Sequence, residues 1–584
     1  METSLEHKRH TLAHLLAIAV RRDFPHAKPT IGPAIENGFY YDFDFSGGEA
    51  PTEASLKKLE KNMRAALPAW KEFSHRVVSP DEAREVFAGN PYKLEIINDL
   101  EKAGETITLY TVGEGHFEFT DLCRGGHTEH PSEEIDPESF ALTTLAGAYW
   151  RGDEKNPMLT RIYGLAFSTK EELAAYRTQI DEAKKRDHRK LGKELDLFTI
   201  SPLVGAGLPL LKPKGMIIRQ EIESYLWQLH KDKGYSRVWT PHITNLALYE
   251  TSGHAEKFGD ELFRVKGGDE DFALKPMNCP HHMQIFADNQ FSYRDMPVRY
   301  FEPATVYRYE KSGQLSGLTR VRAITQDDGH LFCRVSQITE EVSTIVAIIR
   351  EFYKTMGLLD EYWVSLSVRG GDNMYLGSDE VWDAAESALE EAAKLNALNY
   401  RRVEGEAAFY GPKLDFMFKD AIGREWQLAT IQCDFNLPER FDLTFINENG
   451  KKERPVVIHR AISGSLERFM GVMIEHFGGN FPLWLSPEQI RVIPVSETHL
   501  AYATEVYEAL KSVGIRAVLD TSNESMGKKI RNAKTARLPY FAVVGDAEVT
   551  ARNVMLESRN GESTARTLSE LGNHLRAEID TKKI

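Results

Sequence analysis

A long stretch of charged, helix-favouring residues constrains this chain most, because it divides the sequence into parts that must fold separately. The stretch TKEELAAYRTQIDEAKKRDHRKLGKELDLF begins at Thr169. Its apolar positions are sparse, a pattern typical of a helix that bridges two domains. Thr169 or Ser168 can cap the first turn, where Glu171 and Glu172 suit the helix N-terminus. We therefore expect a linker helix over residues 169–195, with a domain on either side.

The segments on the two sides of this linker differ in their secondary-structure pattern. Residues 1–168 mix helices with short alternating strands, which is typical of an α+β domain. Residues 196–482 hold many strands joined by turns rather than crossover helices, and predict a largely antiparallel sheet. Residues 483–584 alternate strand and helix, and predict an α/β domain with a parallel sheet. The expected fold class is multidomain, α+β and α/β.

Composition excludes several classes of protein. No run of about 18 apolar residues occurs, so we expect no membrane span, and the N-terminal segment follows no secretory cleavage pattern. The four cysteines are too widely separated for a disulfide framework and indicate a cytoplasmic protein. The net charge of −15 is unusual for a nucleic-acid binder. However, MGKKIRNAKTAR (526–537) is basic without an acid, and is either a solvated helix face or a contact for nucleic acid.

Two stretches carry residue types that bind metals. KPMNCPHHM (275–283) holds one cysteine and two histidines, but no C-x₂-C or H-x₃-H spacing, so further ligands must come from elsewhere in the chain. In the N-terminal domain, HTLAH places two histidines on one helical face, and DLCRGGH adds an acid, a cysteine and a histidine on a glycine turn. On spacing alone this second set predicts a zinc site. Its four ligand-type residues are His10, His14, Cys123 and His127, and Asp121 lies in the same pocket.

Three further stretches suggest a binding site for an anionic ligand. In YRYEKSGQLSGLTRVRAITQDDGHLF, Arg308 and Glu310 alternate on one face of a predicted strand, and Arg320 follows in a loop. Two arginines on such a hairpin can clamp a polyphosphate, although ordinary surface ion pairs are the alternative. In GSLERFMGVMIEHF, Arg468 opposes the helix dipole and so predicts an anionic or π partner. Pro241 in KGYSRVWTPHI indicates an edge strand or a subunit contact.

The order of these stretches resembles the three motifs of class II aminoacyl-tRNA synthetases. KPMNCP, TQDDGHLFC, IHRAISGSLERF and RDHRKLGKELDLF resemble bacterial-type threonyl-tRNA synthetases in particular, and the resemblance covers the whole chain. It implies a homodimeric ligase that joins threonine to tRNA(Thr) through a threonyl-adenylate, with ATP converted to AMP and pyrophosphate. It also implies an editing domain, a catalytic domain and an anticodon-binding domain in that order. The ubiquitin-like (TGS) domain of many members is expected to be absent.

The resemblance implies roles for individual residues of the catalytic domain. Arg308 holds the α-phosphate of ATP, Arg320 holds the β- and γ-phosphates, and Arg468 stacks on the adenine. Further contacts to ATP come from Glu310 and Gln427, and Mg²⁺ accompanies the nucleotide. The threonine pocket implied by the resemblance consists of Met277, Asp328, Tyr410 and Gln432. One zinc ion per subunit is held by Cys279, His330 and His459, and its open position accepts the amine and hydroxyl of threonine.

Zinc of this kind rejects valine, which lacks the hydroxyl, but not serine, which lacks only a methyl group. The resemblance therefore implies that the N-terminal pocket hydrolyses mischarged seryl-tRNA with an activated water and no obligatory metal. Lys93 joins the five residues of that pocket as a further candidate. Whether the pocket binds a metal stays open at this point. For the anticodon, the resemblance and the basic cluster suggest Lys528, Lys529 and Glu548.

The chain departs from the family pattern at three positions. Ile324 replaces a phenylalanine that sandwiches the adenine, His281 stands where glycine is usual, and Glu557 occupies the place of an arginine that helps to read the anticodon. Two alternatives remain. A class II ligase for proline or serine lacks the combination of Cys279, His330 and His459. The second alternative is a catalytically weakened paralogue that acts as an RNA-binding or regulatory protein. Ile324 is consistent with this alternative, whereas the retained arginines argue against it.

Overall fold

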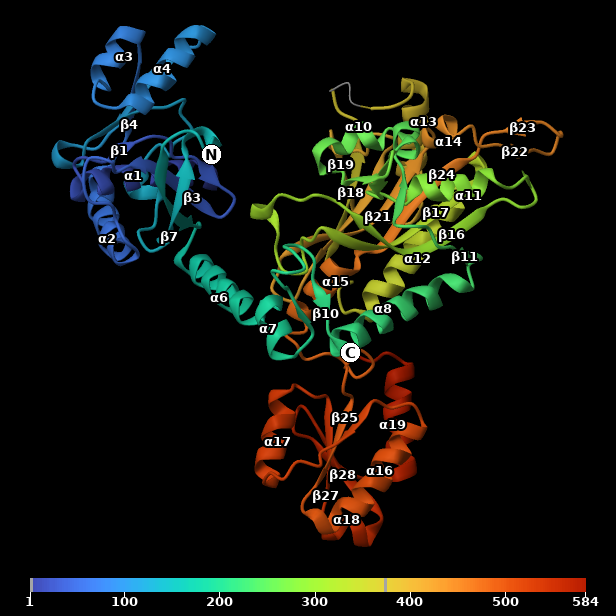
Figure 1. Cartoon of the computed structure of the whole chain (residues 1–584). Helices are drawn as coiled ribbons and strands as arrows, with labels where there is room; N and C mark the ends of the chain where they lie inside the picture. Colours follow the sequence, from blue (N-terminus) through green and yellow to red (C-terminus); the bar gives the residue numbers. More distant parts are fainter. Residues whose placement is uncertain (1–3, 372–374) are drawn as a thin grey trace. The chain divides into compact units, whose positions relative to one another are not determined.

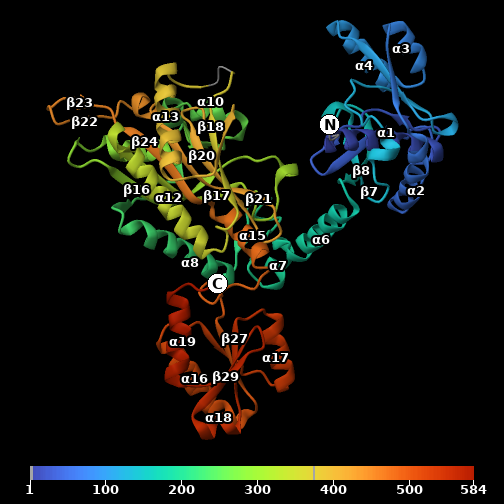
Figure 2. The same cartoon turned by 180° about the vertical axis from the view of Figure 1, so that it is seen from behind.

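The computed structural model describes residues 4–371 and 375–584. The chain divides between Asp181 and Glu182 into two compact units. Each unit is described by itself (Figures 1 and 2). This boundary lies within helix α6 (Lys170–Arg186), which belongs to the predicted linker. Among the described helices, none is both long and apolar enough to cross a membrane.

The first unit is an α+β fold with two small sheets. Its main sheet has the order β1-β3-β8-β7 with β2 beside β3, and its second sheet has the order β4-β5-β6. Helix α1 (Leu5–Asp23) is buried along most of its length and packs on the main sheet. The other helices are α2 (Leu56–Ala66), α3 (Pro80–Val86), α4 (Pro91–Ala103) and α5 (Pro131–Glu134). The strands are β1 (Lys28–Pro29), β2 (Ala34–Ile35), β3 (Gly38–Asp44), β4 (Phe73–Val78), β5 (Ile107–Val112), β6 (Phe119–Leu122), β7 (Phe140–Tyr149) and β8 (Met158–Ala166).

The second unit is built on an eight-stranded sheet with the order β11-β16-β17-β24-β21-β20-β18-β19. Its central strands are all antiparallel, as the turn-linked pattern predicts, and only the outer pairs β11–β16 and β18–β19 are parallel. The strands are β11 (Tyr235–Arg237), β16 (Val298–Tyr307), β17 (Ala323–Cys333), β18 (Tyr362–Val368), β19 (Tyr400–Glu404), β20 (Lys413–Lys419), β21 (Glu425–Asp434) and β24 (Val456–Ser465).

Because side chains alternate along each strand, the two faces of this sheet carry different residues. Leu331, Ile458 and Ile431 point into the main core, which helices α8 (Pro213–Lys231), α12 (Ile338–Thr355), α13 (Asp379–Leu395) and α15 (Leu466–His476) complete. Their chain neighbours therefore point to the opposite face, where α11 (Cys279–Ala287) packs through Phe286 on Phe332. The polar residues of interest lie on this second face.

Smaller elements complete the unit around the large sheet. The short helices are α7 (His188–Glu194), α9 (Ala247–Ser252), α10 (His254–Phe258) and α14 (Leu437–Arg440). The short strands are β9 (Phe198–Thr199), β10 (Leu210–Leu211), β12 (Ile243–Asn245), β13 (Arg264–Gly267), β14 (Glu270–Leu274), β15 (Phe291–Ser292), β22 (Phe445–Ile446) and β23 (Lys452–Glu453).

The C-terminal part of the second unit is a five-stranded α/β sheet with the order β26-β25-β27-β28-β29. The predicted parallel arrangement is confirmed for β25 (Ile490–Pro494), β26 (Ala517–Leu519) and β27 (Tyr540–Val544). An antiparallel hairpin of β28 (Asn553–Ser558) and β29 (Ser563–Thr567) extends the sheet. The helices are α16 (Leu500–Ser512), α17 (Met526–Thr535), α18 (Asp546–Ala551) and α19 (Leu568–Asp580).

Two local predictions differ from the structure. The single linker helix is instead two helices, because Asp187 interrupts α6 and caps α7 by accepting from the Arg189 N–H. Arg308 and Glu310 do not lie on a strand face. Strand β16 ends at Tyr307: the Arg308 N–H still donates to the carbonyl of Arg322, but the Glu310 N–H turns back to the carbonyl of Arg308 instead of reaching the opposite chain. Both residues therefore belong to the loop 308–322.

A buried ion pair fixes the register of the central strands. Asp327 and Arg460 are both fully buried, with 3.6 Å between Arg460 Nη1 and Asp327 Oδ2. Asp327 also accepts from the backbone N–H groups of Ile462 and Ser463, next to the bulge that separates Gln326 from Asp328. The pair thus holds β24 at one position along β17.

We predict that Arg460→Leu destabilises the second unit by about 3–5 kcal/mol, because the variant leaves a buried carboxylate without its counter-charge. Urea denaturation followed by circular dichroism measures the shift. Lys419→Leu is the control, since its ion pair with Glu361 lies exposed on the same sheet and should leave the transition unchanged. An equal shift in both variants contradicts the prediction.

Candidate functional sites

Three residues that are far apart in the sequence meet on the second face of the large sheet. His330 on β17 lies directly opposite His459 on β24, and Cys279 begins helix α11 above them. All three side chains are buried, and one possible ligand atom from each lies within 4.8 Å of the others. Asn278, Pro280 and His281 contribute no atom to this group. The compact cluster KPMNCPHHM therefore supplies one ligand-type residue, as the spacing argument expects.

The hydrogen bonds around this group leave lone pairs directed at a common point. Glu302 accepts from His282 Nε2 at 3.0 Å, so His282 Nδ1 must accept the 2.7 Å hydrogen bond from His330 Nδ1. The proton on His330 is thereby on Nδ1 and its Nε2 is free to bind a metal. His459 Nε2 donates to Asp434 Oδ2 at 2.8 Å, and His459 Nδ1 is buried without a hydrogen-bond partner.

This donor set fits a zinc ion. Metal-binding histidines usually donate their second N–H to a carboxylate or carbonyl, and both imidazoles do so here, one directly and one through His282. Burial raises the pKa of the Cys279 thiol well above its ordinary value, so a cation is needed to keep the sulfur as a thiolate. One cysteine and two histidines are typical ligands of a zinc that keeps a coordination position open.

His254 also contacts this group, and sequence reasoning missed it. It begins helix α10, is fully buried, and places Nε2 3.5 Å from Cys279 Sγ. Burial lowers the pKa of His254 to about 3, so the ring is neutral. The only signal for it in the sequence is the turn SGH, which separates α9 from α10. His281, flagged as unusual for the family, is buried beside Tyr249 and has neither ring nitrogen hydrogen-bonded.

The predicted threonine-pocket residues surround the same group. Gln432 lies opposite His459 on β21, and Tyr410 donates to Gln432 Oε1 at 2.5 Å while its ring stacks on His459. Asp328 accepts from Asn278 Nδ2 at 2.9 Å. Met277 lies on the other side, where its sulfur contacts the guanidinium of Arg308. These residues combine a carboxylate, an amide and a phenol next to the three ligand-type side chains.

The predicted nucleotide arginines lie around the loop 308–322. Arg308 stacks over Phe258, 5.0 Å from the ring centroid, and its Nε donates to the carbonyl of Pro276. Arg320 forms a 2.7 Å ion pair with Glu310. Arg468, in the first turn of α15, donates from Nε to the carbonyl of Thr319. Burial and the nearby Arg320 lower the pKa of the Arg468 guanidinium.

Gln427 lies on β21 opposite Met417, beyond a bulge at Phe416 that reverses the alternation of the strand. Its side chain is exposed and points away from Leu428, which belongs to the main core. Gln427 therefore lies on the same face of the sheet as Gln432. Ile324 faces Val306 across β16 and β17, close to the arginines.

The N-terminal unit contains a second site, a cavity of about 740 Å³. His10 and His14 on α1 reach it from one side, and Cys123 after β6 reaches it from the other. Cys123 Sγ lies 3.5 Å from His10 Nε2 and 3.3 Å from His127 Nε2. His127 itself stacks on Phe73 behind the cavity wall. The predicted cluster is thus brought together.

A buried charged pair forms the floor of this cavity. Lys93 Nζ lies 2.5 Å from Asp121 Oδ1, and both side chains are almost fully buried. Tyr41, which sequence reasoning missed, donates to Asp121 Oδ2 at 2.6 Å. Its strand, GFYYDFD, is buried on both faces and gave no sign of a functional tyrosine. Lys93, a secondary candidate from sequence, therefore lies at the centre of the site.

Burial shifts the pKa values of three groups of this cluster. Burial lowers the pKa of His127 to about 2 and lowers that of His14 well below its ordinary value. Burial also raises the pKa of the Cys123 thiol to about 11. Neutral imidazoles can hydrogen-bond a water, whereas a neutral thiol is a poor nucleophile. The same atoms also lie within 4.8 Å of one another, so their spacing alone would accept a metal.

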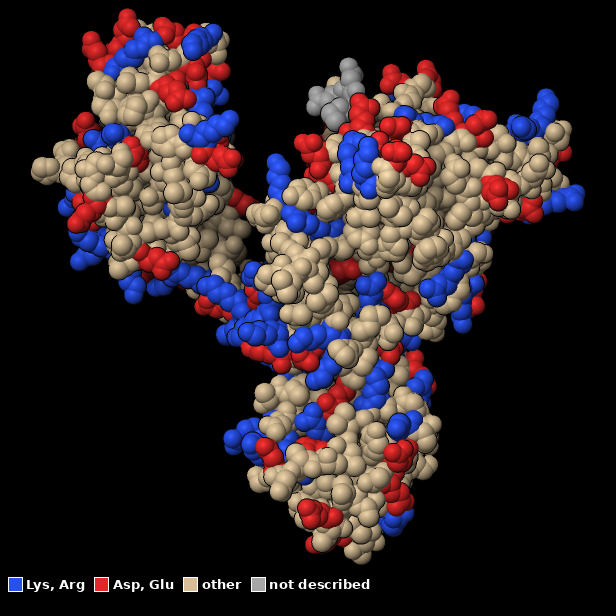
Figure 3. Space-filling view, viewed as in Figure 1, with Lys and Arg blue, Asp and Glu red and all other residues tan. Residues whose placement is uncertain are grey.

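The basic cluster of the C-terminal part forms helix α17, where Figure 3 shows lysine and arginine side chains. Lys528 is exposed and pairs with Glu524. Lys529 is buried and donates to the carbonyl of Asp520, a structural contact. Glu548 caps α18 by accepting from the Gly545 N–H, and Glu557 pairs with Lys534 at 3.0 Å. Lys528 is thus the one of the three anticodon candidates whose charge is presented to solvent.

Three family models match this chain. Residues 107–163 match the second additional domain of threonyl and alanyl tRNA synthetases, within the first unit. Residues 263–477 match the class II tRNA synthetase core domain of the G, H, P, S and T group. Residues 489–578 match an anticodon-binding domain. The matched segments follow the order that the sequence motifs predicted.

Solved structures share the fold of the second unit. The RNA-binding domain of threonyl-tRNA synthetase from Cryptosporidium parvum superposes with a TM-score of 0.65 and 36% identity, over 67% of this chain and 98% of that one. Prolyl-tRNA synthetase from Giardia lamblia has a TM-score of 0.55 at 17% identity, over 69% of this chain and 81% of that one, and shares the fold alone.

Curated relatives match nearly the whole chain. The threonine–tRNA ligase of Gloeobacter violaceus is 47% identical over 570 residues, which is 96% of this chain and 90% of the relative. The threonine–tRNA ligase of Deinococcus radiodurans is 47% identical over 580 residues, which is 98% of this chain and 88% of the relative. The chain therefore belongs to the threonine–tRNA ligase family of class II aminoacyl-tRNA synthetases.

Proposed function

We propose that this chain activates L-threonine with ATP, transfers it to tRNA(Thr), and hydrolyses seryl-tRNA(Thr) formed in error. The observation that carries the proposal is the meeting of Cys279, His330 and His459 beside the loop 308–322 on one face of the sheet. A metal-type donor set for an amino acid and a set of arginines for a polyphosphate thus adjoin. Homodimerisation belongs to the same proposal, supported by Trp239, which is 74% exposed beside the edge strand β11.

The activation step requires positioning more than acid–base chemistry. Arg308 would hold the α-phosphate while the threonine carboxylate attacks it, and pyrophosphate leaves towards Arg320. Binding of ATP with Mg²⁺ must replace the ion pair between Arg320 and Glu310, which frees Glu310 for the adenine edge. Arg468 would stack on the adenine, with Ile324 in place of an aromatic partner on the opposite side, and Gln427 would contact the nucleotide from β21.

The threonine pocket selects through polar groups. A zinc ion on Cys279, His330 and His459 would bind the amine and the side-chain hydroxyl of threonine, a pair that valine cannot supply. Asp328 would take the amine, and Tyr410 with Gln432 would orient the rest of the substrate. Met277 lies between this pocket and Arg308 and so borders both substrates.

Hydrolytic editing would take place in the cavity of the first unit. Asp121, held by Lys93 and Tyr41, supplies a buried carboxylate, and the neutral His10 and His14 can orient a water. The neutral Cys123 thiol would act through hydrogen bonds with His10 and His127 rather than as a nucleophile. At the other end of the chain, Lys528 would contact the anticodon arm.

Threonine-dependent exchange of pyrophosphate into ATP tests the synthetase activity. We expect exchange with threonine, weaker exchange with serine and little with valine in the wild type. Cys279→Ala should lose threonine exchange by more than about 100-fold, because the pocket then loses the groups that demand a hydroxyl. Absence of exchange by the wild type, with zinc supplied, would favour the RNA-binding paralogue. An equal loss for all three amino acids would indicate that the metal has only a structural role.

Metal analysis by mass spectrometry tests the two candidate sites separately. We expect one zinc per wild-type chain, none in Cys279→Ala and one in Cys123→Ala, because only the first group has both imidazole tautomers fixed for a metal. Two zinc ions per wild-type chain, with one lost in Cys123→Ala, would show that the editing cavity is also a metal site.

Deacylation of seryl-tRNA(Thr) tests the editing cavity. We expect His10→Ala to slow hydrolysis by about 100-fold, since the ring is placed to orient a water, and to leave threonine exchange unchanged. His26→Ala is the matched control, because His26 belongs to the same unit but does not line the cavity; its ring bonds the carbonyl of Glu49 and packs against Phe24 and Phe45. Normal deacylation by His10→Ala would remove the cavity from the proposal.

A further inference from the structure

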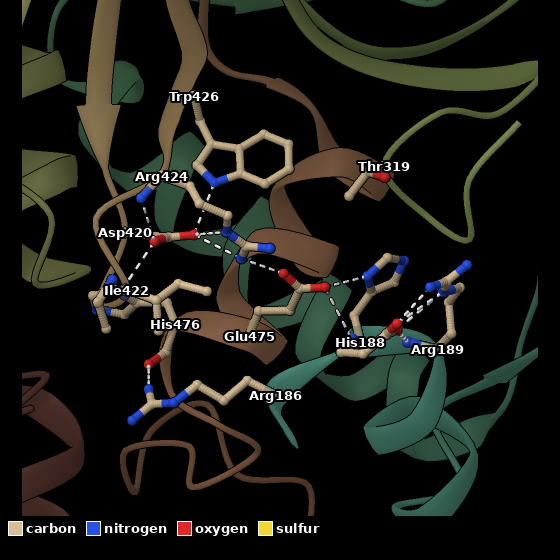
Figure 4. Close-up of polar contacts among 12 residues, drawn as sticks. Arg186, His188, Arg189, Thr319, Asp420, Ile422, Arg424, Trp426, Glu475 and His476 are labelled. Atoms are coloured by element: carbon tan, nitrogen blue, oxygen red, sulfur yellow. Dashed lines mark hydrogen bonds and ion pairs between the residues drawn. The ribbon is translucent and has the colours of Figure 1, made fainter. Parts of the chain in front are cut away.

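His188, at the start of helix α7, joins the linker to two elements of the nucleotide site. It is buried, and its Nδ1 lies 2.6 Å from Glu475 Oε1 on α15. Its Nε2 lies 3.0 Å from the backbone nitrogen of Leu318 in the loop 308–322. Figure 4 shows the His188 ring beside the Glu475 carboxylate, with a dashed line joining the two.

The direction of these hydrogen bonds is determined by the backbone. A peptide N–H can only donate, so His188 Nε2 must accept from Leu318 and the ring proton must reside on Nδ1. Nδ1–H then donates to Glu475, which also accepts from the backbone N–H of His188 at 3.0 Å. Both ring nitrogens are therefore engaged. Although Asp187, His188 and Glu475 are close enough to hold a metal, the hydrogen bonds account for them.

Glycines allow the loop to approach the ring so closely. A Cβ on Gly317, whose φ is +48°, would lie 2.1 Å from His188 Nε2. Gly471 on α15 faces the same contact, and a Cβ there would lie 3.1 Å from Thr319 Cγ2 and 3.6 Å from His188 Cδ2. Glycines thus lie where the loop, α7 and α15 come into contact, and a larger residue at either glycine would push these elements apart.

Glu475 is anchored on its other side by the hairpin between β20 and β21. Arg424 pairs with Glu475 and, at 2.7 Å, with Asp420, and Asp420 also accepts from the indole of Trp426 (Figure 4). Gln427, predicted to contact ATP, follows Trp426 directly in β21. The carboxylate that holds His188 is therefore itself fixed, and the imidazole is a rigid acceptor for the loop.

The loop end of this network reaches the nucleotide arginines. Leu318, held by His188, precedes Thr319, whose carbonyl accepts from Arg468 Nε at 3.1 Å. Arg320 follows in the chain and projects from the same turn, which the hydrogen bond from the Arg320 N–H to the Ser316 carbonyl closes. A shift of the loop away from His188 would move both arginines relative to each other.

We propose that His188 is a positioning residue for ATP: it holds the loop 308–322 so that Arg320 and Arg468 face one nucleotide. This inference rests on the proposed synthetase function. The linker then takes part in building the nucleotide site, through α7, in addition to connecting two domains. Loss of the hydrogen bond to Leu318 raises the KM for ATP and leaves the KM for threonine unchanged, because the threonine pocket lies beyond Arg308.

Two substitutions separate the two hydrogen bonds of the ring. In His188→Asn the amide lies at the position of Nδ1, so it can donate to Glu475 but offers no acceptor to Leu318. In His188→Gln the amide oxygen reaches the position of Nε2 and can accept from Leu318. Lys190→Ala is the control on the same helix, because Lys190 is exposed and pairs only with Glu194 at 4.0 Å.

Pyrophosphate exchange measures KM for ATP and for threonine in each variant, and thermal unfolding reports on structure. We expect KM for ATP to rise about five- to tenfold in His188→Asn, the effect of one buried hydrogen bond, and to return to within about twofold of wild type in His188→Gln. Lys190→Ala should match the wild type. A His188 that is only structural would lower the melting temperature in both variants without changing KM for ATP, and that result overturns the inference.

Gly471→Ala provides a second test that does not depend on the folding of His188→Asn. Alanine favours the helix, while its Cβ presses on Thr319 and His188, so KM for ATP should rise here too. An unchanged KM for ATP in Gly471→Ala, or an equal rise in His188→Asn and His188→Gln, also overturns the inference. Absence of exchange in the wild type refutes the proposed function itself, and is thereby distinguished from failure of the inference alone.

Discussion

The register of β17 against β24 is the constraint on which the catalytic part depends. It places His330 opposite His459 on one face, and the neighbouring Leu331 and Ile458 in the core on the other. Because side chains alternate with a period of two, a slip of one residue would bury the metal-type ligands in the apolar core and expose the core residues to the substrate side. The Asp327 carboxylate, at the bulge, prevents such a slip by accepting from β24.

Placing so many polar groups on a buried face requires compensation at its edges. The two imidazole chains end on the carboxylates of Glu302 and Asp434, so every proton in them has an acceptor. Glu302 in turn accepts from the Thr240 N–H and lies 3.8 Å from the ammonium of Lys275. The ligand geometry is thus fixed by residues on β16 and β21 and in the segments that precede β12 and follow β14. A substrate can then be selected by polar contacts, because the site does not rearrange freely around a wrong one.

Local patterns singled out residues that lie in short motifs, whereas His330 and His459 were assigned through the family resemblance and some residues outside any motif were missed. Cys279, Arg320 and Arg468 were found because each lies in a short pattern, a turn, a loop or a first helical turn. His254 and Tyr41 were missed, because each reaches its site from a segment whose sequence contains no motif typical of a functional site. The strand assignment of Arg308 and Glu310 failed because the chain turns just after Arg308, where the Glu310 N–H donates to the Arg308 carbonyl, and the alternating pattern of the sequence does not indicate this turn.

The linker is a second case in which the local sequence did not predict the structure. Its sparse apolar pattern describes α6 well, where only Leu173 is buried. Past Asp187, however, α7 buries His188, Leu191 and Gly192, although its composition is as charged as that of α6. Polar composition therefore did not mean exposure. A histidine can be buried when both of its ring nitrogens are hydrogen-bonded. Because the tautomer of His188 is fixed, its ring can hold the glycine-containing loop in place. The segment that divides the chain is consequently also part of the architecture of its nucleotide site.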